Sequence, residues 1–276
     1  MTDFLALDGK SIVFIGGGNM AGAMIGGLIN ARDSHELNLT IGVSDKHTDK
    51  LAHFAKQGVQ TAMPDTAHTL IEKADVVVLA VKPQVLADVA PTLAPYLADK
   101  LVLSVLAGVS VATLTNALGT AHVVRAMPNL PASVGAGATG LYASADINEG
   151  SRAICEAIMS SCGVAVWVAD EDKLHAVTAV SGSAPAYFFY VLEHMTSEAV
   201  AMGLPVDVAH KLAVQSMIGA GLLARHGNPT ALREAVTSKG GTTAQAINSL
   251  SHDDVGGAFG RAMRACYERS VELGKL

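Results

Sequence analysis

The sequence of 276 residues has few aromatic residues, few charges and little cysteine. Aromatic residues make up 4% of the chain and charged residues 16%, while 50% of the residues are hydrophobic. A disordered chain combines low hydrophobicity with high net charge, so this composition excludes that class. The net charge of −6 argues against a general nucleic-acid binder, which needs a basic face. We therefore expect a globular chain with an aliphatic core, in one large domain or two ordinary ones.

Long hydrophobic runs and targeting signals are also lacking. The longest apolar run in the strand-rich part, Val76 to Val81, is far shorter than the roughly 20 residues that span a bilayer. The first ten residues carry neither a basic region nor a long apolar one, so we expect no secretory signal. Cys155, Cys162 and Cys266 form no CxxC pair and no metal-ligand spacing, which is typical of buried thiols in a reducing cytosol. These features predict a cytoplasmic protein with no metal and no membrane or nucleic-acid partner.

The first half of the chain alternates short apolar strands with helices. Strands are predicted at 11–15, 39–43, 59–61, 76–81, 101–106 and 122–125, with helices at 19–31, 49–57, 67–73 and 84–97. Continuous apolar strands separated by helices indicate a parallel sheet that is covered on both faces. Right-handed crossovers then give a Rossmann-like, doubly wound α/β fold.

The pattern changes after about Asp170, where strand signals stop. Helices are predicted at 172–202, 206–225, 229–237, 242–250 and 255–273, so we divide the chain into an α/β domain at 1–169 and a helical domain at 170–276. Residues 210–224 are apolar on nearly every face, which predicts a helix buried all round. We expect a subunit interface there, because a small helical domain cannot easily bury so much apolar surface alone; burial within one chain is the alternative.

A glycine-rich turn follows the first predicted strand. Gly16, Gly18 and Ala21 are spaced as G-x-G-x-x-A between a strand and a helix. The first glycine permits a tight turn, the second lets a pyrophosphate approach the backbone, and the small third residue allows close packing of helix and strand. The N–H groups at the start of the helix then face an anion. This context predicts dinucleotide binding.

The end of the second strand leaves the choice of dinucleotide open. An acidic residue at this point favours NAD, and cations favour the 2′-phosphate of NADP. Asp45 favours NAD, whereas Lys46 with His47 and Ser44 favours NADP.

Three further loops lie at the predicted carboxyl edge of the sheet. Lys82 ends an apolar run and either contacts the cofactor or is a solvated loop lysine. Small residues at 104–109 would let a nicotinamide ring lie against the backbone, and a third loop follows Arg125.

Two stretches of the helical half interrupt the helical pattern. Glycine and proline within 181–187 predict a kink or a close approach of two segments. At 237–243, two glycines precede Thr242, and Gln245 follows three residues later, which predicts a capping box at a helix start. The free N–H groups there could hold a substrate carboxylate; the alternative is a plain capped helix.

Together these motifs resemble those of the pyrroline-5-carboxylate reductase family along the full chain. The segments that carry the resemblance are IGGGNM (15–20), AVKPQ (80–84), LAGV (106–109), RAMPN (125–129), AVTAVSGSAPAY (176–187) and TSKGGTT (237–243). The resemblance implies reduction of 1-pyrroline-5-carboxylate to L-proline with NAD(P)H, usually NADPH. It also implies a Rossmann domain followed by a helical dimerisation domain, in homodimers that often assemble into decamers.

The resemblance also implies roles for individual residues. Thr243 would be catalytic, with its hydroxyl on the ring nitrogen, and the N–H groups of 241–243 would bind the carboxylate. The implied substrate residues are Glu171, Ser238, Gly240, Gly241, Thr242 and Thr243. The implied cofactor residues are Ile15, Gly16, Gly17, Gly18, Asn19, Met20, Ser44, Asp45, Lys46, Val81, Lys82, Pro83, Val105, Ala107 and Asn129. Because the two sets fall in different halves of the sequence, we expect the site to form where the domains meet.

The sequence departs from the family pattern at four positions. Lys239 replaces a usual proline, and Asp45 stands where a neutral residue is common. Ala67 and Ala235 stand where members carry a cofactor-contacting asparagine. These departures leave the cofactor preference open. Two rival readings fit less well: a β-hydroxyacid dehydrogenase needs a lysine that 181–195 lacks, and a non-catalytic dinucleotide-binding regulator needs no substrate loop.

Overall fold

The computed structural model describes residues 3–144 and 146–274. Its packing divides the chain into two compact units. Unit 1 comprises Met1–Ser183 together with Tyr267–Leu276, and unit 2 comprises Ala184–Cys266. The predicted functional boundary at 169/170 stays a prediction, since compactness alone groups 170–183 and the end of the chain with unit 1.

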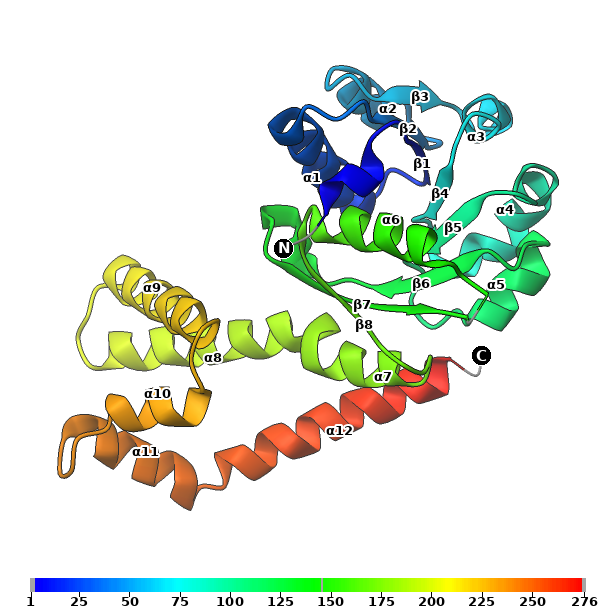
Figure 1. Cartoon of the computed structure of the whole chain (residues 1–276). Helices are drawn as coiled ribbons and strands as arrows, with labels where there is room; N and C mark the ends of the chain where they lie inside the picture. The colour runs from blue at the N-terminus through cyan, green and yellow to red at the C-terminus, as the bar shows by residue number, and fades with distance from the viewer. Residues whose placement is uncertain (1–2, 145, 275–276) are drawn as a thin grey trace. The chain divides into compact units, whose positions relative to one another are not determined.

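Unit 1 is built on an eight-stranded sheet of the order β3-β2-β1-β4-β5-β6-β7-β8 (Figure 1). All neighbouring strands are parallel except β6 and β7. The strands are β1 Ser11–Ile15, β2 Thr40–Ser44, β3 Gln60–Ala62, β4 Val76–Leu79, β5 Leu101–Ser104, β6 Val123–Met127, β7 Gly137–Ala143 and β8 Gly163–Trp167.

Helices cover both faces of this sheet and create two hydrophobic cores. Side chains alternate along a strand, so Ile12 and Phe14 of β1 enter one core while Val13 and Ile15 enter the other. The first core includes α1 Asn19–His35, α2 Thr48–Ala55 and α6 Glu149–Ser160; the second includes α3 His68–Ile71, α4 Leu86–Leu93 and α5 Val111–Leu118. Short 3₁₀ turns lie at Phe4–Leu7, Pro64–Thr66, Pro83–Val85, Ala94–Tyr96 and Leu130–Val134. The predicted doubly wound fold is confirmed.

The helices α5 and α6 and the strands β7 and β8 were not predicted, and the expected wholly parallel sheet is wrong at the β6–β7 pair. β6 and β7 are joined by a short 3₁₀ turn rather than by a crossover helix, which permits antiparallel pairing. β7 contains Gly137 and Gly140, and glycine weakens a strand signal. Gly140 is required by packing, because a Cβ there would lie 2.7 Å from the Val177 side chain.

The predicted helix over 172–202 is divided in the structure. It consists of α7 Lys173–Val177, a π-helical turn η6 at Thr178–Gly182, and α8 Ala184–Ala201. The division falls within the glycine- and proline-containing stretch where the sequence predicted a kink.

Unit 2 is helical. After α8 it contains α9 Val206–Ala224, α10 Pro229–Ala235 and α11 Thr242–His252, and α12 Val255–Leu273 begins in it. Within one chain, the expectation that α9 is buried all round is wrong: Ala209 and Ala213 are its buried residues, while Leu212 and Leu223 are 56% and 64% exposed.

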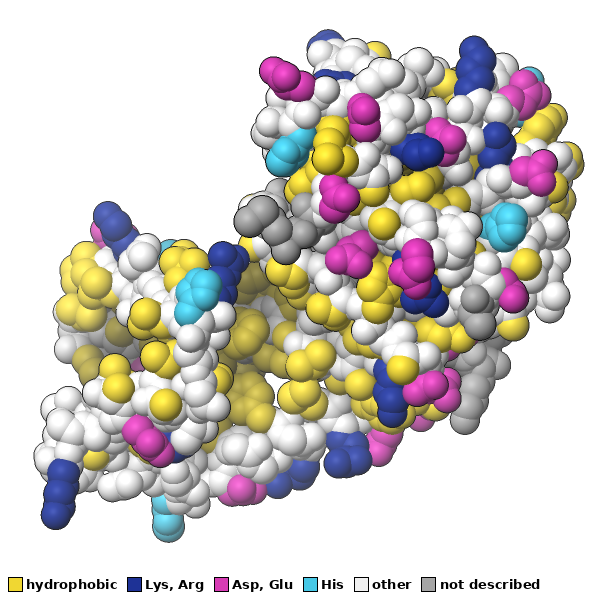
Figure 2. All heavy atoms as spheres, in the orientation of Figure 1, with side chains coloured by type: hydrophobic (Ala, Val, Ile, Leu, Met, Phe, Trp, Pro, Cys, Tyr) yellow, Lys and Arg dark blue, Asp and Glu magenta, His cyan; other side chains and the backbone are white. Residues whose placement is uncertain are grey.

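Apolar side chains of α8 and α12 also line an open groove of about 590 Å³ that includes Tyr190, Val191 and Phe259. Hydrophobic side chains are visible on the surface of this unit (Figure 2). This is the surface expected of an interface that a single chain leaves uncovered. Among the described residues, no helix combines the length and apolar character that crossing a membrane requires.

Candidate functional site

The glycine turn after β1 has the geometry that its sequence predicts. Gly16 has a φ of +100°, a conformation that favours glycine, and a Cβ there would lie 2.7 Å from the Ala80 carbonyl oxygen. Gly18 is different: its φ is −76°, and a Cβ there would have no neighbour within 4 Å. Gly16 is therefore required by the fold, whereas the space at Gly18 is open for a ligand at the N-terminus of α1, which begins at Asn19.

Three hydrogen bonds join the ends of four strands at this edge of the sheet. The Gly16 N–H donates to the Ser44 carbonyl at 2.8 Å, the Ala80 N–H to the Ile15 carbonyl at 2.9 Å, and the Val105 N–H to the Leu79 carbonyl at 3.1 Å. The structure thereby brings together the predicted cofactor residues that follow β1, β2, β4 and β5. The parts of this group open to solvent are Asn19, Lys46, Lys82 and Ala107, with Met20, Val81, Pro83 and Val105 half-buried. Open α/β sheets bind their ligands in the crevice at this edge.

Asp45 holds the glycine turn with its carboxylate. Its Oδ2 accepts from the Gly17 N–H at 2.7 Å, and its Oδ1 accepts from the His47 N–H at 2.9 Å and lies 2.7 Å from His47 Nδ1. Lys50 Nζ lies 3.9 Å from Oδ2. Burial opposes ionisation, but the hydrogen bonds from Gly17 and His47, with the Lys50 charge, bring the pKa of Asp45 below its ordinary 3.8. The carboxylate is thus ionised at neutral pH, with the Lys50 ammonium as its charged neighbour.

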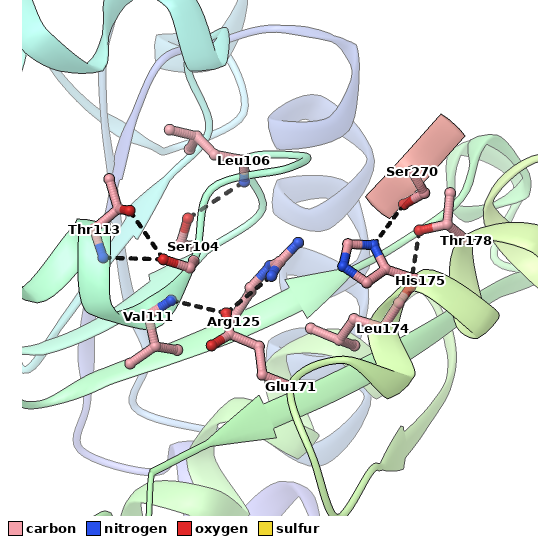
Figure 3. Close-up of polar contacts among 11 residues, drawn as sticks. Ser104, Leu106, Val111, Thr113, Arg125, Glu171, Leu174, His175, Thr178 and Ser270 are labelled. Carbon is pink, nitrogen blue, oxygen red and sulfur yellow. Dashed lines mark hydrogen bonds and ion pairs between the residues drawn. The ribbon is translucent and has the colours of Figure 1, made fainter. Parts of the chain in front are cut away.

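A buried arginine pairs with Glu171 beside the carboxyl end of β5 (Figure 3). Glu171 Oε1 accepts from Arg125 Nη1 at 2.9 Å and from the Val111 N–H at 2.8 Å, so one oxygen binds a cation and caps the start of α5. The side chains of Arg125 and Glu171 are 7% and 24% exposed. The sequence contained a signal for this pair, since Arg125 is a single charge inside the apolar strand β6.

His175 follows this pair on α7. Its Nδ1 lies 2.9 Å from the Ser270 hydroxyl of α12, and its ring meets Tyr267 edge-on. Burial and the nearby Arg125 charge lower the pKa of His175 below 6.5, against the opposing charges of Asp172 and Glu171. No local sequence pattern indicates this contact, because His175 and Ser270 are 95 residues apart in the chain.

Asn129 uses both ends of its amide within unit 1. Its Nδ2 donates to the Ser181 carbonyl at 3.0 Å, and its Oδ1 accepts from the Ala138 N–H at 2.8 Å. The residue is 8% exposed. These contacts favour a positioning role over direct contact with a cofactor.

The predicted capping box at the start of α11 is wrong. The N-cap residue is Gly241, which has no side chain, and Thr242 is the first helical residue. Gly240 has a φ of +72°, and a Cβ at Gly241 would lie 2.5 Å from Ser238 Oγ. The first intrahelical bond runs from the Gln245 N–H to the Gly241 carbonyl. The N–H groups of 242–244 therefore have no partner within the helix, and the half-buried Thr243 lies among them. The expected contribution of the Gly241 N–H is wrong, because that group donates to the Ser238 carbonyl at 3.0 Å.

Comparison with known proteins identifies the family. A family model described as pyrroline-5-carboxylate reductase dimerisation matches residues 171–273, and one described as NADP oxidoreductase, coenzyme F420-dependent, matches residues 11–108. The chain is 43% identical over 274 residues to pyrroline-5-carboxylate reductase of Haemophilus influenzae, covering 97% of this chain and 98% of the relative. The chain belongs to the pyrroline-5-carboxylate reductase family.

Solved structures of the family agree with the fold. The reductase of Coxiella burnetii is 38% identical with a TM-score of 0.89, covering 96% of this chain and 98% of that one. The Plasmodium falciparum enzyme, solved with NADP bound, is 24% identical with a TM-score of 0.81, covering 97% and 99%. The helical region that leaves α9 exposed in a single chain is thus the part of the chain that matches the dimerisation model.

Proposed function

We propose that this chain reduces 1-pyrroline-5-carboxylate to L-proline by hydride transfer from NAD(P)H. The observation that supports this most strongly is that the chain combines an open glycine turn at Gly18 with a helix that begins at Thr242 and has Gly241 as its N-cap. Both features occur in a chain that is 43% identical to such a reductase over nearly its whole length.

The cofactor would be held by the residues at the carboxyl edge of the sheet. The backbone from Ile15 to Met20 and the N-terminus of α1 suit a pyrophosphate, because the open face at Gly18 leaves room for it. Val81, Lys82, Pro83, Val105 and Ala107 line the adjoining strand ends. When bound, the reduced nicotinamide supplies the hydride.

NADPH is our proposed cofactor, with NADH as the alternative. Both oxygens of Asp45 are already hydrogen-bonded to the glycine turn and to His47, while Lys46, the next residue in the chain, is exposed. Lys46 and Lys50 therefore offer positive charge to a 2′-phosphate, and His47 is a further exposed polar side chain in this loop. The comparison of kcat/KM for NADPH and NADH decides this point.

The substrate would be bound by the start of α11. The unpaired N–H groups at 242–244 suit its carboxylate, with Ser238, Gly240 and Gly241 shaping the turn and Glu171 as a further substrate residue. The Thr243 hydroxyl would orient the ring nitrogen and hold its proton. The imine carbon gains the hydride, the C=N π bond breaks, and the protonated nitrogen becomes a secondary amine. Positioning of this kind contributes roughly 7–11 kcal/mol, so no nucleophile is needed.

Thr243→Val tests this assignment. Loss of one oriented hydrogen bond costs about 1–3 kcal/mol, so we expect kcat/KM to fall by at least about fivefold. Oxidation of NADPH with 1-pyrroline-5-carboxylate is the assay, and Thr230→Val, on the exposed surface of α10, is the matched control. Near-normal efficiency of Thr243→Val would remove Thr243 from the mechanism.

The assembly and the location of the protein are proposed as well. We propose a homodimer that assembles into a decamer, which is supported by the exposed apolar surface of α9, and a cytoplasmic location. Sedimentation of the purified chain distinguishes a dimer from a decamer.

A further inference from the structure

The π-helical turn η6 leaves one carbonyl group without a helical donor. In an α-helix the Ser181 carbonyl accepts from the N–H of residue 185, but residue 185 is proline and has no N–H. The turn itself is closed by a bond from the Ser183 N–H to the Thr178 carbonyl at 2.8 Å. Ser181 is half-buried, and an unpaired carbonyl that is shielded from water costs free energy, so a donor from elsewhere stabilises it.

Asn129 supplies that donor. Its Nδ2 lies 3.0 Å from the Ser181 carbonyl oxygen, while the Ala138 N–H fixes the other end of the amide at 2.8 Å. Both bonds are consistent with a single amide orientation, in which the nitrogen faces a carbonyl and the oxygen faces an N–H. The Ser181 hydroxyl is engaged separately, since it donates to the Val177 carbonyl at 3.0 Å.

Close packing holds the same turn against the sheet. A Cβ at Gly182 would lie 2.9 Å from Met127 Cε, and a Cβ at Gly140 would lie 2.7 Å from Val177. The turn η6 therefore packs against Met127 of β6, and the preceding helix α7 packs against Gly140 of β7. Met127 ends β6 and Asn129 follows two residues later, at the edge of the sheet where the nicotinamide is proposed to bind.

We infer that Asn129 is a positioning residue for hydride transfer, acting by hydrogen bonding to the carbonyl that Pro185 leaves unpaired. It fixes the π-helical turn from which α8 continues, and thereby the edge of the sheet beside the nicotinamide. This inference rests on the proposed function, and it assigns Asn129 a role through Ser181 in place of direct binding of the cofactor. π-Helical turns occur frequently at functional sites.

The test is a double-mutant cycle between Asn129 and Pro185. Asn129→Asp keeps the acceptor for the Ala138 N–H but turns a carboxylate oxygen toward the Ser181 carbonyl. We expect kcat to fall about tenfold or more, equivalent to roughly 1.4 kcal/mol, while the dissociation constant for NADPH changes less than about twofold. Pro185→Ala restores an N–H at residue 185, so alone it should retain wild-type kcat. In the Asn129→Asp background it should recover about threefold or more of the lost kcat.

Asn148→Asp is the matched control. Asn148 Oδ1 accepts from the Ser151 N–H as the N-cap of α6, a role that aspartate fills equally well. No change in kcat is expected for it.

Two results would overturn the inference: weaker NADPH binding by Asn129→Asp with kcat unchanged at saturation, or no recovery of kcat in the double variant. If Asn129→Asp does not fold, the double variant is the deciding measurement. The proposed hydrogen bond between Asn129 and Ser181 predicts that the double variant folds, and a double variant that stays unfolded contradicts the inference. An inactive wild-type chain would instead refute the proposed function.

Discussion

Removal of Glu171 should destabilise unit 1 far more than removal of an exposed glutamate. The Arg125 guanidinium is 7% exposed, and Glu171 is its ion-pair partner, at 2.9 Å. Glu171→Ala leaves this cation buried without its counter-charge and also removes the acceptor for the Val111 N–H at the start of α5. Both losses act in the same direction.

The magnitude follows from the burial of the two partners. Breaking a buried ion pair by removing one partner costs about 3–5 kcal/mol. Because the Glu171 side chain is 24% exposed, water can reach part of the site, and we expect a loss of about 3 kcal/mol in the free energy of unfolding. Glu171→Gln keeps an oxygen acceptor for both donors and loses only the charge, so its cost should be about 1–2 kcal/mol.

The chain offers a matched control in Arg269 and Glu272. This pair is also arginine and glutamate, at 2.8 Å, but both side chains are 63% exposed. Exposed pairs contribute about 0–1 kcal/mol, so Glu272→Ala should have almost no effect.

The assay is urea unfolding at one fixed protein concentration. It is followed by the fluorescence of Trp167, the single tryptophan of the chain, which lies on β8 of unit 1. If Glu171→Ala and Glu272→Ala shift the unfolding midpoint equally, or if Glu171→Gln is as costly as Glu171→Ala, the assignment of a buried charge pair is refuted.

Three further predictions concern the glycine turn, His175 and α9. Gly16→Ala should destabilise the fold, because Gly16 has a positive φ and a Cβ there would clash with Ala80. Gly18→Ala should have the unfolding midpoint of the wild type but bind NADPH at least about tenfold more weakly. Equal losses of stability in the two variants would contradict this prediction. Because the pKa of His175 is depressed, its contribution to stability is complete above pH 6.5 and is lost as the pH falls through its folded pKa. His175→Gln should therefore weaken the pH dependence of the urea unfolding midpoint below pH 6.5. The control His122→Gln, at an exposed position, should leave that dependence unchanged. Leu223→Glu, at a 64% exposed position of α9, should reduce the sedimenting mass, and an unchanged mass would place the interface elsewhere.

Much of the fold could be predicted because several of its strands have a distinctive local sequence pattern. β1, β4 and β5 are short, fully apolar runs bounded by turns, and a parallel sheet with both faces covered requires that composition. β7 could not be found in this way. Its glycines are present because Val177 packs against Gly140, a requirement set by tertiary contact that is invisible in a local pattern.

In the candidate site, too, features set by local backbone conformation were predictable, and features set by tertiary contacts were not. Gly16 and Gly18 were predictable because backbone conformation and ligand approach restrict the residue type locally. The capping box was predicted wrongly because Thr242 and Gln245 have the right spacing, but the backbone places Gly241 at the N-cap. Cofactor preference was not decidable from composition at 44–47, because it depends on where the oxygens of Asp45 point, and they point to Gly17 and His47.

The same distinction between local pattern and tertiary contact applies to Asn129, which the sequence places among the cofactor residues. Its place in the loop after β6 indicates an edge position, and edge positions suggest ligand contact. What the sequence does contain is Pro185, which removes a backbone donor at a known place, four residues after Ser181. The sequence can therefore indicate that the Ser181 carbonyl lacks its helical donor. The structure is needed to show that Asn129 is the residue that donates to it. A missing donor is therefore as informative as a motif, since each buried carbonyl must find its hydrogen bond somewhere.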